Sequence, residues 1–120
     1  MAPGGARPVV LVVDDEPSIR LLCKVNLELD GYEVREAGTL AEAREQVSRG
    51  VDVVLLDMHV GNERGDGLLQ ELKDRGTPVV AVTGSTDLAS IARVADDVLA
   101  KPFTIEALGA VVARLSARRM

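Results

Sequence analysis

Short apolar runs alternate along this chain with segments whose apolar residues recur at helical spacing. Runs rich in β-branched residues predict strands, and the segments with a period near 3.6 residues predict helices. Such alternation is typical of repeated βα units around a parallel sheet. The predicted strands are residues 8–13, 32–36, 51–56, 78–82 and 97–100, and the predicted helices are residues 17–29, 39–48, 67–75, 86–94 and 104–117.

The predicted strands differ in polarity. Residues 32–36 alternate apolar with charged side chains, as a strand with one solvated face does, so we place this strand at the edge of the sheet. The other four strands are strongly apolar and are expected to be buried on both faces. Gly31, Gly50 and the segment Gly76-Thr77-Pro78 mark short turns between the elements.

The first predicted helix has a wider apolar arc than one buried face usually needs. Three readings stay open for the flank of this arc: it docks a partner, it packs under neighbouring loops, or it is scattered apolar surface of the kind common on soluble proteins. The predicted core stripe is Ile19, Leu22, Cys23 and Leu27, and the flank is Leu21, Val25 and Leu29.

Length and charge limit the classes of protein to consider. A chain of 120 residues is expected to form one domain, structured over about residues 8–117, with residues 1–7 flexible. With 14 basic and 19 acidic residues, the chain has no general electrostatic reason to bind nucleic acid or an anionic membrane. A lone cysteine, Cys23, excludes an internal disulfide and fits a reducing, cytoplasmic setting. The first apolar run is too short for a signal peptide or a membrane span.

Three carboxylates stand where predicted strands stop. Asp57 follows the run at residues 51–56, and Asp14 and Asp15 follow the run at residues 9–13. The carboxyl ends of parallel strands open onto one crevice, so these acids are expected to converge. Two like charges 4 Å apart repel by about 4 kcal/mol at an effective dielectric near 20. Protons or a hard divalent cation must neutralise the cluster, and an all-oxygen site suits Mg²⁺.

Two further polar residues end strands at the same predicted edge. Thr83 follows residues 78–82, and Lys101 follows residues 97–100. A hydroxyl and an ammonium can each contact a phosphoryl oxygen. Together with a carboxylate nucleophile and a Mg²⁺ site, they are the parts needed to move a phosphoryl group onto an aspartate, a reaction governed by positioning and charge stabilisation.

These residues, taken in order, resemble a known family. Asp14-Asp15, Asp57, Thr83-Gly84 and Lys101-Pro102-Phe103, all at strand ends, resemble the response-regulator receiver domain of two-component signalling, over nearly the whole chain. The resemblance implies an α/β fold, a (βα)5 doubly wound, flavodoxin-like three-layer sandwich. It also implies a five-stranded parallel sheet of order 2-1-3-4-5, an order taken from the family and not from the pattern of this chain.

The resemblance assigns a role to each acid. It implies that Asp57 accepts a phosphoryl group from a histidine kinase or a histidine phosphotransfer protein. Asp14, Asp15 and Asp57 would hold Mg²⁺, and the backbone carbonyl of His59 would complete the protein ligands. His59 is the sole histidine, and one imidazole cannot build a histidine metal site.

The resemblance also assigns Thr83 and Lys101 to the phosphoryl oxygens and makes the Lys101–Pro102 peptide cis, a costly form found almost only before proline. Such a domain is chiefly a signalling switch. It would catalyse its own Mg²⁺-dependent phosphorylation and dephosphorylation, and whether to count it as an enzyme stays open.

Three features depart from the family. The loop at residues 60–67 is longer than usual and lacks the customary proline. The segment from Thr83 to Lys101 is shorter by about one helical turn, which predicts a shortened fourth helix. Val98 stands where the family commonly places an aromatic residue that turns inward on activation.

The output of the domain stays open at this point. The chain contains no effector domain, so we expect protein association with a downstream effector in trans, phosphate buffering in a relay, or an output region outside this chain. Direct contact with nucleic acid or a membrane is not expected, and the oligomeric state is undetermined. An alternative function is a receiver-like protein-interaction module that works without phosphorylation.

Two other classes fit less well. A phosphatase of the haloacid dehalogenase type needs a second acid two residues after its nucleophile, where this chain has His59. A flavodoxin-like binder needs a phosphate loop after the first strand, where the acids at residues 14–16 would repel phosphate.

Overall fold

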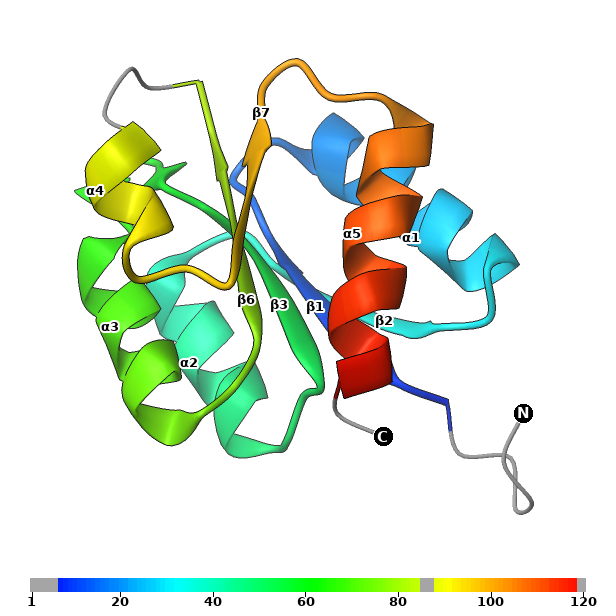
Figure 1. Cartoon of the computed structure of the whole chain (residues 1–120), viewed down its shortest axis with the longest axis horizontal. Coiled ribbons are helices and arrows are strands. Elements are labelled where there is room, and N and C mark those ends of the chain that lie inside the picture. Colours follow the sequence, from blue (N-terminus) through cyan, green and yellow to red (C-terminus); the bar gives the residue numbers. More distant parts are fainter. Residues whose placement is uncertain (1–6, 85–87, 119–120) are drawn as a thin grey trace.

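The computed structural model describes residues 7–84 and 88–118 as a three-layer α/β sandwich (Figure 1). Its central sheet is parallel, with the strand order β2-β1-β3-β6-β7. This order confirms the predicted 2-1-3-4-5, because β4 and β5 belong to a separate small hairpin. The strands of the sheet are β1 (Val9–Val13), β2 (Glu33–Ala37), β3 (Val53–Asp57), β6 (Val79–Thr83) and β7 (Asp97–Ala100).

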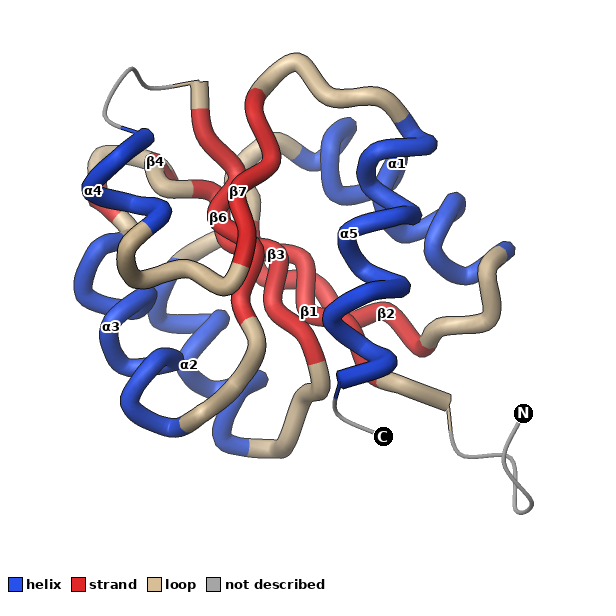
Figure 2. The backbone as a smooth tube through the Cα atoms, in the orientation of Figure 1, coloured by secondary structure: helices blue, strands red, loops and turns tan. Residues whose placement is uncertain are grey.

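The described residues form five helices. These helices cover the two faces of the sheet (Figure 2). Helices α1 (Pro17–Leu29) and α5 (Ile105–Arg118) pack on one face. Helices α2 (Leu40–Ser48), α3 (Asp66–Arg75) and α4 (Leu88–Ala92) pack on the other. The predicted doubly wound architecture is therefore confirmed. None of the described helices combines the length and apolar content that crossing a bilayer requires.

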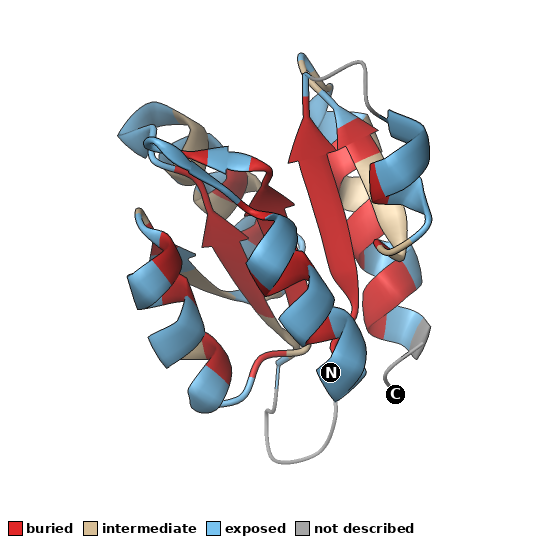
Figure 3. Ribbon diagram, turned by 90° about the vertical axis from the view of Figure 1, so that its left-hand side faces the viewer, coloured by how far each residue is buried: buried red, intermediate tan, exposed pale blue. Residues whose placement is uncertain are grey.

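Two apolar cores form because the central strands are covered on both sides. Along β1, Val10 and Val12 pack toward α1 and α5, whereas Leu11 and Val13 pack toward α2 and α3. Successive side chains of a strand point to opposite faces, so a continuous apolar run serves both cores. Figure 3 shows these strands as the buried centre of the molecule.

The two edge strands differ from the centre. β2 lies at one edge, as predicted, and its Glu33 and Glu36 are exposed. β7 lies at the other edge, where Asp97 and Val98 are half-buried and Ala100 is exposed. As predicted, both faces of β7 are covered: Val98 packs against the core under α2, α3 and α4, and Leu99 is buried in the core under α1 and α5. Burial is incomplete because β7 has a neighbouring strand on one side only.

The predicted core stripe of α1 needs one correction. Cys23 and Leu27 are buried and Ile19 is half-buried, but Leu22 is 42% exposed. At 100° per residue, Leu22 lies about 120° around the helix from the midpoint between Cys23 and Leu27, which points it away from the sheet. Leu22 therefore joins the exposed flank of Leu21, Val25 and Leu29.

The long loop after β3 folds into a hairpin that the sequence analysis did not predict. β4 (His59–Val60) pairs antiparallel with β5 (Glu63–Arg64) across Gly61-Asn62. Gly61 has φ +62°, and no described residue other than glycine has a positive φ. A positive φ at the first central position alone defines a type II′ turn, whose twist matches that of the flanking strands.

Helix α4 is short, as the reduced spacing between Thr83 and Lys101 predicted. It covers five residues, from Leu88 to Ala92, where residues 86–94 were expected. Residues 86 and 87 lie outside the described part of the chain, as do residues 1–6, which were predicted to be flexible. Ile91 is the buried side chain of this helix.

Candidate functional site

The register of the sheet brings the predicted site residues to one edge. In a parallel sheet the carboxyl ends of all strands lie at the same edge, where ligands bind in folds of this class. Asp14 follows β1 directly, Asp57 and Thr83 are the last residues of β3 and β6, and Lys101 follows β7 directly. The register pairs at this edge are Val13 with Leu56, Asp57 with Val82, and Thr83 with Ala100.

The three acids form the predicted cluster. Asp14 is 2% exposed and Asp57 is 6% exposed, whereas Asp15 is open to solvent. One carboxylate oxygen from each lies within 4.8 Å of the others. Two oxygen ligands of one Mg²⁺ lie about 3 to 4 Å apart, since each sits 2.0–2.1 Å from the ion. Small side-chain rotations would bring the three carboxylate oxygens from within 4.8 Å to this spacing. The three oxygen donors therefore fit a hard divalent cation.

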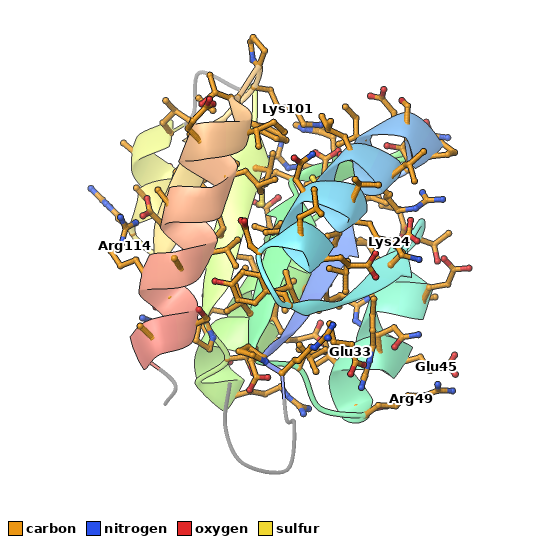
Figure 4. The ribbon with its side chains drawn as sticks, turned by 90° about the vertical axis from the view of Figure 1, so that its right-hand side faces the viewer. Lys24, Glu33, Glu45, Arg49, Lys101 and Arg114 are labelled. Carbon is orange, nitrogen blue, oxygen red and sulfur yellow. The ribbon has the colours of Figure 1, made fainter. Side chains whose placement is uncertain are left out.

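Lys101 lies between the two buried acids. Its Nζ is 3.0 Å from Asp57 Oδ2 and 3.3 Å from Asp14 Oδ2. Burial by itself lowers the pKa of Lys101, but hydrogen bonds and charge from Asp57 and Asp14 outweigh burial and raise it. One ammonium among three ionised carboxylates leaves two negative charges, which matches a divalent cation. Figure 4 places Lys101 at the opposite end of the molecule from Glu33.

The carboxylate of Asp14 is buried at the end of β1. Burial raises its pKa, against a hydrogen bond from the Glu16 amide to Oδ1 at 2.9 Å and the nearby charge of Lys101. The charge of Asp57 adds to the increase. Ionised Asp14 is therefore costly without a cation beside it, as the electrostatic argument from the sequence requires.

Both carboxylate oxygens of Asp57 are engaged. The His59 amide donates a hydrogen bond to Oδ1 at 3.0 Å, and Lys101 donates to Oδ2. The adjacent Met58 is fully buried, and its amide donates to the carbonyl of Val82 on β6 at 3.1 Å. These contacts fix the direction of the Asp57 side chain. The assignment of the His59 carbonyl to the metal stays a prediction.

Thr83 and Lys101 lie side by side at the ends of β6 and β7. The Lys101 amide donates to the Thr83 carbonyl at 2.9 Å, and Thr83 is 2% exposed. The Lys101–Pro102 peptide is cis, as the resemblance implied. The structure thus brings all of the predicted side chains to one edge.

The sequence analysis missed one contact at this site. Arg20, on α1, donates from Nη1 to the backbone carbonyl of Asp14 at 2.6 Å and from Nε to Glu36 Oε1 at 3.2 Å. A single arginine on a helix gives no recognisable pattern. Its contact with Glu36 depends on β2 lying beside β1, which the spacing of residues does not reveal.

Cys23 lies beneath this edge and is not part of the polar cluster. It is 2% exposed, and burial, reinforced by the charge of Asp14, raises its pKa to about 11. The thiol therefore stays protonated at neutral pH and packs as a small apolar group.

Comparison with known proteins agrees with this geometry. A family model described as the response regulator receiver domain matches residues 10–113. The transcriptional regulatory protein KdpE of Mycobacterium tuberculosis is 36% identical over 104 residues, which cover 82% of this chain and 46% of that protein. The KDP operon transcriptional regulatory protein KdpE of Escherichia coli is 34% identical over 116 residues, covering 92% and 51%. The chain thus spans about half the length of these curated relatives.

Solved structures give the same result. The receiver domain of a Francisella response regulator is 30% identical and superimposes with a TM-score of 0.84, covering 94% of this chain and 99% of that one. A CheY-like receiver domain protein from Methanospirillum hungatei is 26% identical with a TM-score of 0.86, covering 95% and 97%. Fold, site geometry and sequence relatives agree, and the chain belongs to the response regulator receiver domain family of two-component systems.

Proposed function

We propose that this receiver domain accepts a phosphoryl group on Asp57 in a Mg²⁺-dependent reaction, and that phosphorylation changes the binding of a partner protein. The observation that supports this most directly is the arrangement around Asp57. A buried carboxylate at a strand end is held by the His59 amide and the Lys101 ammonium, beside two further acids. That set combines a nucleophile with groups that stabilise charge on a phosphoryl group.

The transfer follows from these positions. An Asp57 carboxylate oxygen attacks the phosphorus of a phosphohistidine, the new P–O bond forms, and the P–N bond breaks. The electron pair stays on the imidazole nitrogen, which takes up a proton, and Asp57 becomes an acyl phosphate. Lys101 moves its ammonium from the free carboxylate toward a phosphoryl oxygen, and the Thr83 hydroxyl donates to another.

Asp14, Asp15, Asp57 and the His59 carbonyl would hold Mg²⁺. When bound, the ion neutralises charge on the phosphoryl oxygens during transfer. Asp14 and Asp15 keep their carboxylates directed at the ion while Asp57 reacts. In this role the chain catalyses its own phosphorylation, and later hydrolysis by water ends the signal.

The partners follow from the family and from the composition. We infer that the donor is a histidine kinase or a histidine phosphotransfer protein in the cytoplasm. The relatives are described as transcriptional regulators, and this chain spans about half of their length. We propose a single receiver domain over residues 1–120 that acts on a protein effector in trans, without direct contact to nucleic acid or membrane.

A second candidate function is a receiver-like interaction module that works without phosphorylation. Two observations favour it. Val98 stands where many family members have an aromatic switch residue, and the five-residue α4 reduces the surface next to β7 that responds in such switches.

Reaction with acetyl phosphate tests the choice between the two functions. Intact mass spectrometry should detect one added phosphoryl group on the native chain in the presence of Mg²⁺ and none after chelation with EDTA. Asp57→Asn should remain unmodified, while the control Asp74→Asn, on the exposed part of α3, should react as the native chain does. Modification that survives in Asp57→Asn would contradict the proposed acceptor, and a native chain that never reacts would favour the interaction module.

A further inference from the structure

We propose that Arg20 is a positioning residue that fixes the direction of the Asp14–Asp15 pair and thereby sets the affinity of the site for Mg²⁺. This inference rests on the proposed metal site. It concerns a side chain that touches neither Asp57 nor the phosphoryl group, and acts through the backbone of Asp14.

Asp14 is held by four hydrogen bonds, one of which comes from Lys101 Nζ to Oδ2 at 3.3 Å. Its amide donates to the Ala37 carbonyl on β2 at 3.1 Å, and its side chain accepts from the Glu16 amide. Its carbonyl accepts from Arg20 Nη1 at 2.6 Å. The bonds to Ala37 and Glu16 lie within the sheet edge and the following turn. The bond from Arg20 ties the peptide between Asp14 and Asp15 to the body of α1.

The Asp14 carbonyl belongs to the peptide unit that joins Asp14 to Asp15. Because a peptide unit is planar, fixing its oxygen restricts ψ of Asp14 and φ of Asp15 together. Those two angles set the direction of the Asp15 side chain relative to Asp14 and β1. A charge-assisted hydrogen bond at this oxygen therefore fixes how the exposed Asp15 carboxylate lies relative to the buried Asp14.

Arg20 is itself held in place. Its Nε pairs with Glu36 Oε1 at 3.2 Å, and Lys24 on the next turn of α1 lies 3.8 Å from Glu36 Oε2. The side chain of Arg20 is 20% exposed, the lowest value among the described arginines that form ion pairs. The guanidinium therefore links the ends of β1 and β2, because its Nη1 binds the Asp14 carbonyl and its Nε binds Glu36.

Gly38 gives independent support. A Cβ atom at Gly38 would lie 3.1 Å from Arg20 Nη1, tighter than ordinary van der Waals contact. The backbone of Gly38 is not in a left-handed conformation that would demand glycine. The missing side chain therefore leaves the space that Arg20 needs to reach the Asp14 carbonyl.

Charge and positioning predict opposite effects, which makes the role testable. Arg20 places a positive charge near a cation site, so its charge alone weakens Mg²⁺ binding. Removing it should tighten binding if only charge matters. If Arg20 positions the acids, its removal should weaken binding, as loss of contacts that orient metal ligands commonly does.

The test compares Mg²⁺ dissociation constants by titration of the unphosphorylated chain. We expect Arg20→Gln and Arg20→Lys each to raise the dissociation constant about 10-fold, because neither side chain can bind the Asp14 carbonyl and Glu36 as the planar guanidinium does. Lysine keeps the positive charge, so its variant separates positioning from charge. Gly38→Ala, which keeps Arg20 but displaces its guanidinium, should raise it by a smaller factor. Arg35→Gln makes the same charge change on β2, where Arg35 pairs with Glu33, and should leave the constant unchanged.

Hydrogen exchange of the Asp14 amide in the metal-free chain gives a readout that does not depend on the ion. Exchange should accelerate in both Arg20 variants and in Gly38→Ala, and not in Arg35→Gln. Tighter or unchanged Mg²⁺ binding in Arg20→Gln, or native affinity in Arg20→Lys, would overturn the proposal. If the native chain binds Mg²⁺ independently of Asp14, Asp15 and Asp57, the proposed metal site fails instead.

Discussion

Lys101 supplies the positive charge that offsets the negative charges of the two buried acids, Asp14 and Asp57. Its Nζ contacts Asp57 and Asp14 at 3.0 and 3.3 Å. Removing one partner of a buried pair leaves the other with the cost of its lost hydration, which is larger than the net value of the hydrogen bond. Lys101 therefore has one role in the resting protein and is proposed to have another after phosphorylation.

We expect Lys101→Ala to lower the free energy of unfolding by about 1–3 kcal/mol without Mg²⁺, because a buried acceptor loses its donor. Urea denaturation with and without Mg²⁺ measures this loss, and Lys73→Ala on the exposed side of α3 is the control. The variant should keep Mg²⁺ binding, since the ligands are carboxylates, but its amide chemical shifts should respond less to phosphorylation. Equal loss of both properties would contradict the role of Lys101.

Asp14 predicts a dependence of stability on pH. Burial raises its pKa in the folded chain above the ordinary value of 3.8. A raised pKa means that Asp14 favours folding below the unfolded value, and that this contribution is lost as pH rises through the folded value. Without metal, ionised Asp14 therefore weakens the fold at neutral pH.

Thermal unfolding in EDTA should show Asp14→Asn to be more stable than the native chain at pH 7. The difference should shrink as pH falls toward 3.8 and the native Asp14 becomes protonated. Asp74→Asn, on the exposed end of α3, controls for the loss of a negative charge. An Asp14→Asn variant that is less stable at pH 7, or equally changed at all pH values, would exclude this effect of burial.

At the residue scale, the sequence predicted the residues of the site but not the contacts that hold them in place. Asp14, Asp57, Thr83 and Lys101 could be located because each one follows or ends an apolar run, and strand ends share an edge. Arg20 could not be found, since a single arginine on a helix has no pattern and its bond to Glu36 depends on strand order. That order came from family resemblance.

At the scale of elements, the start of α3 is packed directly against the acceptor strand. A Cβ atom at Gly65 would lie 3.1 Å from the Asp57 carbonyl oxygen and 3.3 Å from Met58 Cα. Both are backbone atoms, which cannot move aside as a flexible side chain does. Gly65 therefore sets how closely α3 and the β4–β5 hairpin approach Asp57.

Gly65→Ala is expected to lower the free energy of unfolding by about 1–3 kcal/mol, the usual cost of forcing extra volume into a packed site. Chemical denaturation measures it. Gly67→Ala is the matched control, because its Cβ would meet only Arg44 Nη2, at 3.8 Å, and alanine favours a helix. If the two variants are equally stable, the close approach at Gly65 is not a structural constraint.

The elements also explain where prediction stopped. The β4–β5 hairpin was missed because strands of two residues are too short to show alternation, although Gly61-Asn62 between Val60 and Glu63 is a recognised hairpin signal. The short α4 was predicted because the spacing between Thr83 and Lys101 is smaller than the family's. Leu22 was wrongly predicted to be buried, because the spacing of apolar residues along a helix does not reveal how wide its buried face is.

At the scale of the whole molecule, the proposed Mg²⁺ site would couple metal binding to folding. An ion that binds only the folded chain stabilises the fold by mass action. The three carboxylates come from the ends of two strands and one loop, so unfolding separates them. Mg²⁺ binding and folding would therefore be linked in one equilibrium between the unfolded chain and the metal-bound folded chain.

Mg²⁺ at ten times its dissociation constant should raise the free energy of unfolding by about 1.4 kcal/mol. Thermal unfolding of the native chain with MgCl₂, compared with NaCl at equal ionic strength, measures this gain. Asp15→Asn, which removes an exposed acid of the cluster, should gain less. Equal stabilisation by both salts would point to general screening and not to a site.

The overall architecture was predictable because the alternation of apolar runs and helical periods extends through the chain. The prediction was less accurate at the edge of the sheet. β7 has an apolar sequence like a central strand, yet Val98 is half-buried. Hydropathy alone does not distinguish a central strand from an edge strand that is covered by helices.

The central claim is that Asp57 carries the phosphoryl group, and chemical trapping tests it most directly. Borohydride reduces an acyl phosphate to an alcohol, which would convert a phosphorylated Asp57 to homoserine while leaving free carboxylates intact. After reaction with acetyl phosphate and Mg²⁺, peptide mass spectrometry should find homoserine at position 57 and at no other aspartate. Reduction at another aspartate, or a stable phosphoryl group on His59 with Asp57 unmodified, would contradict the account.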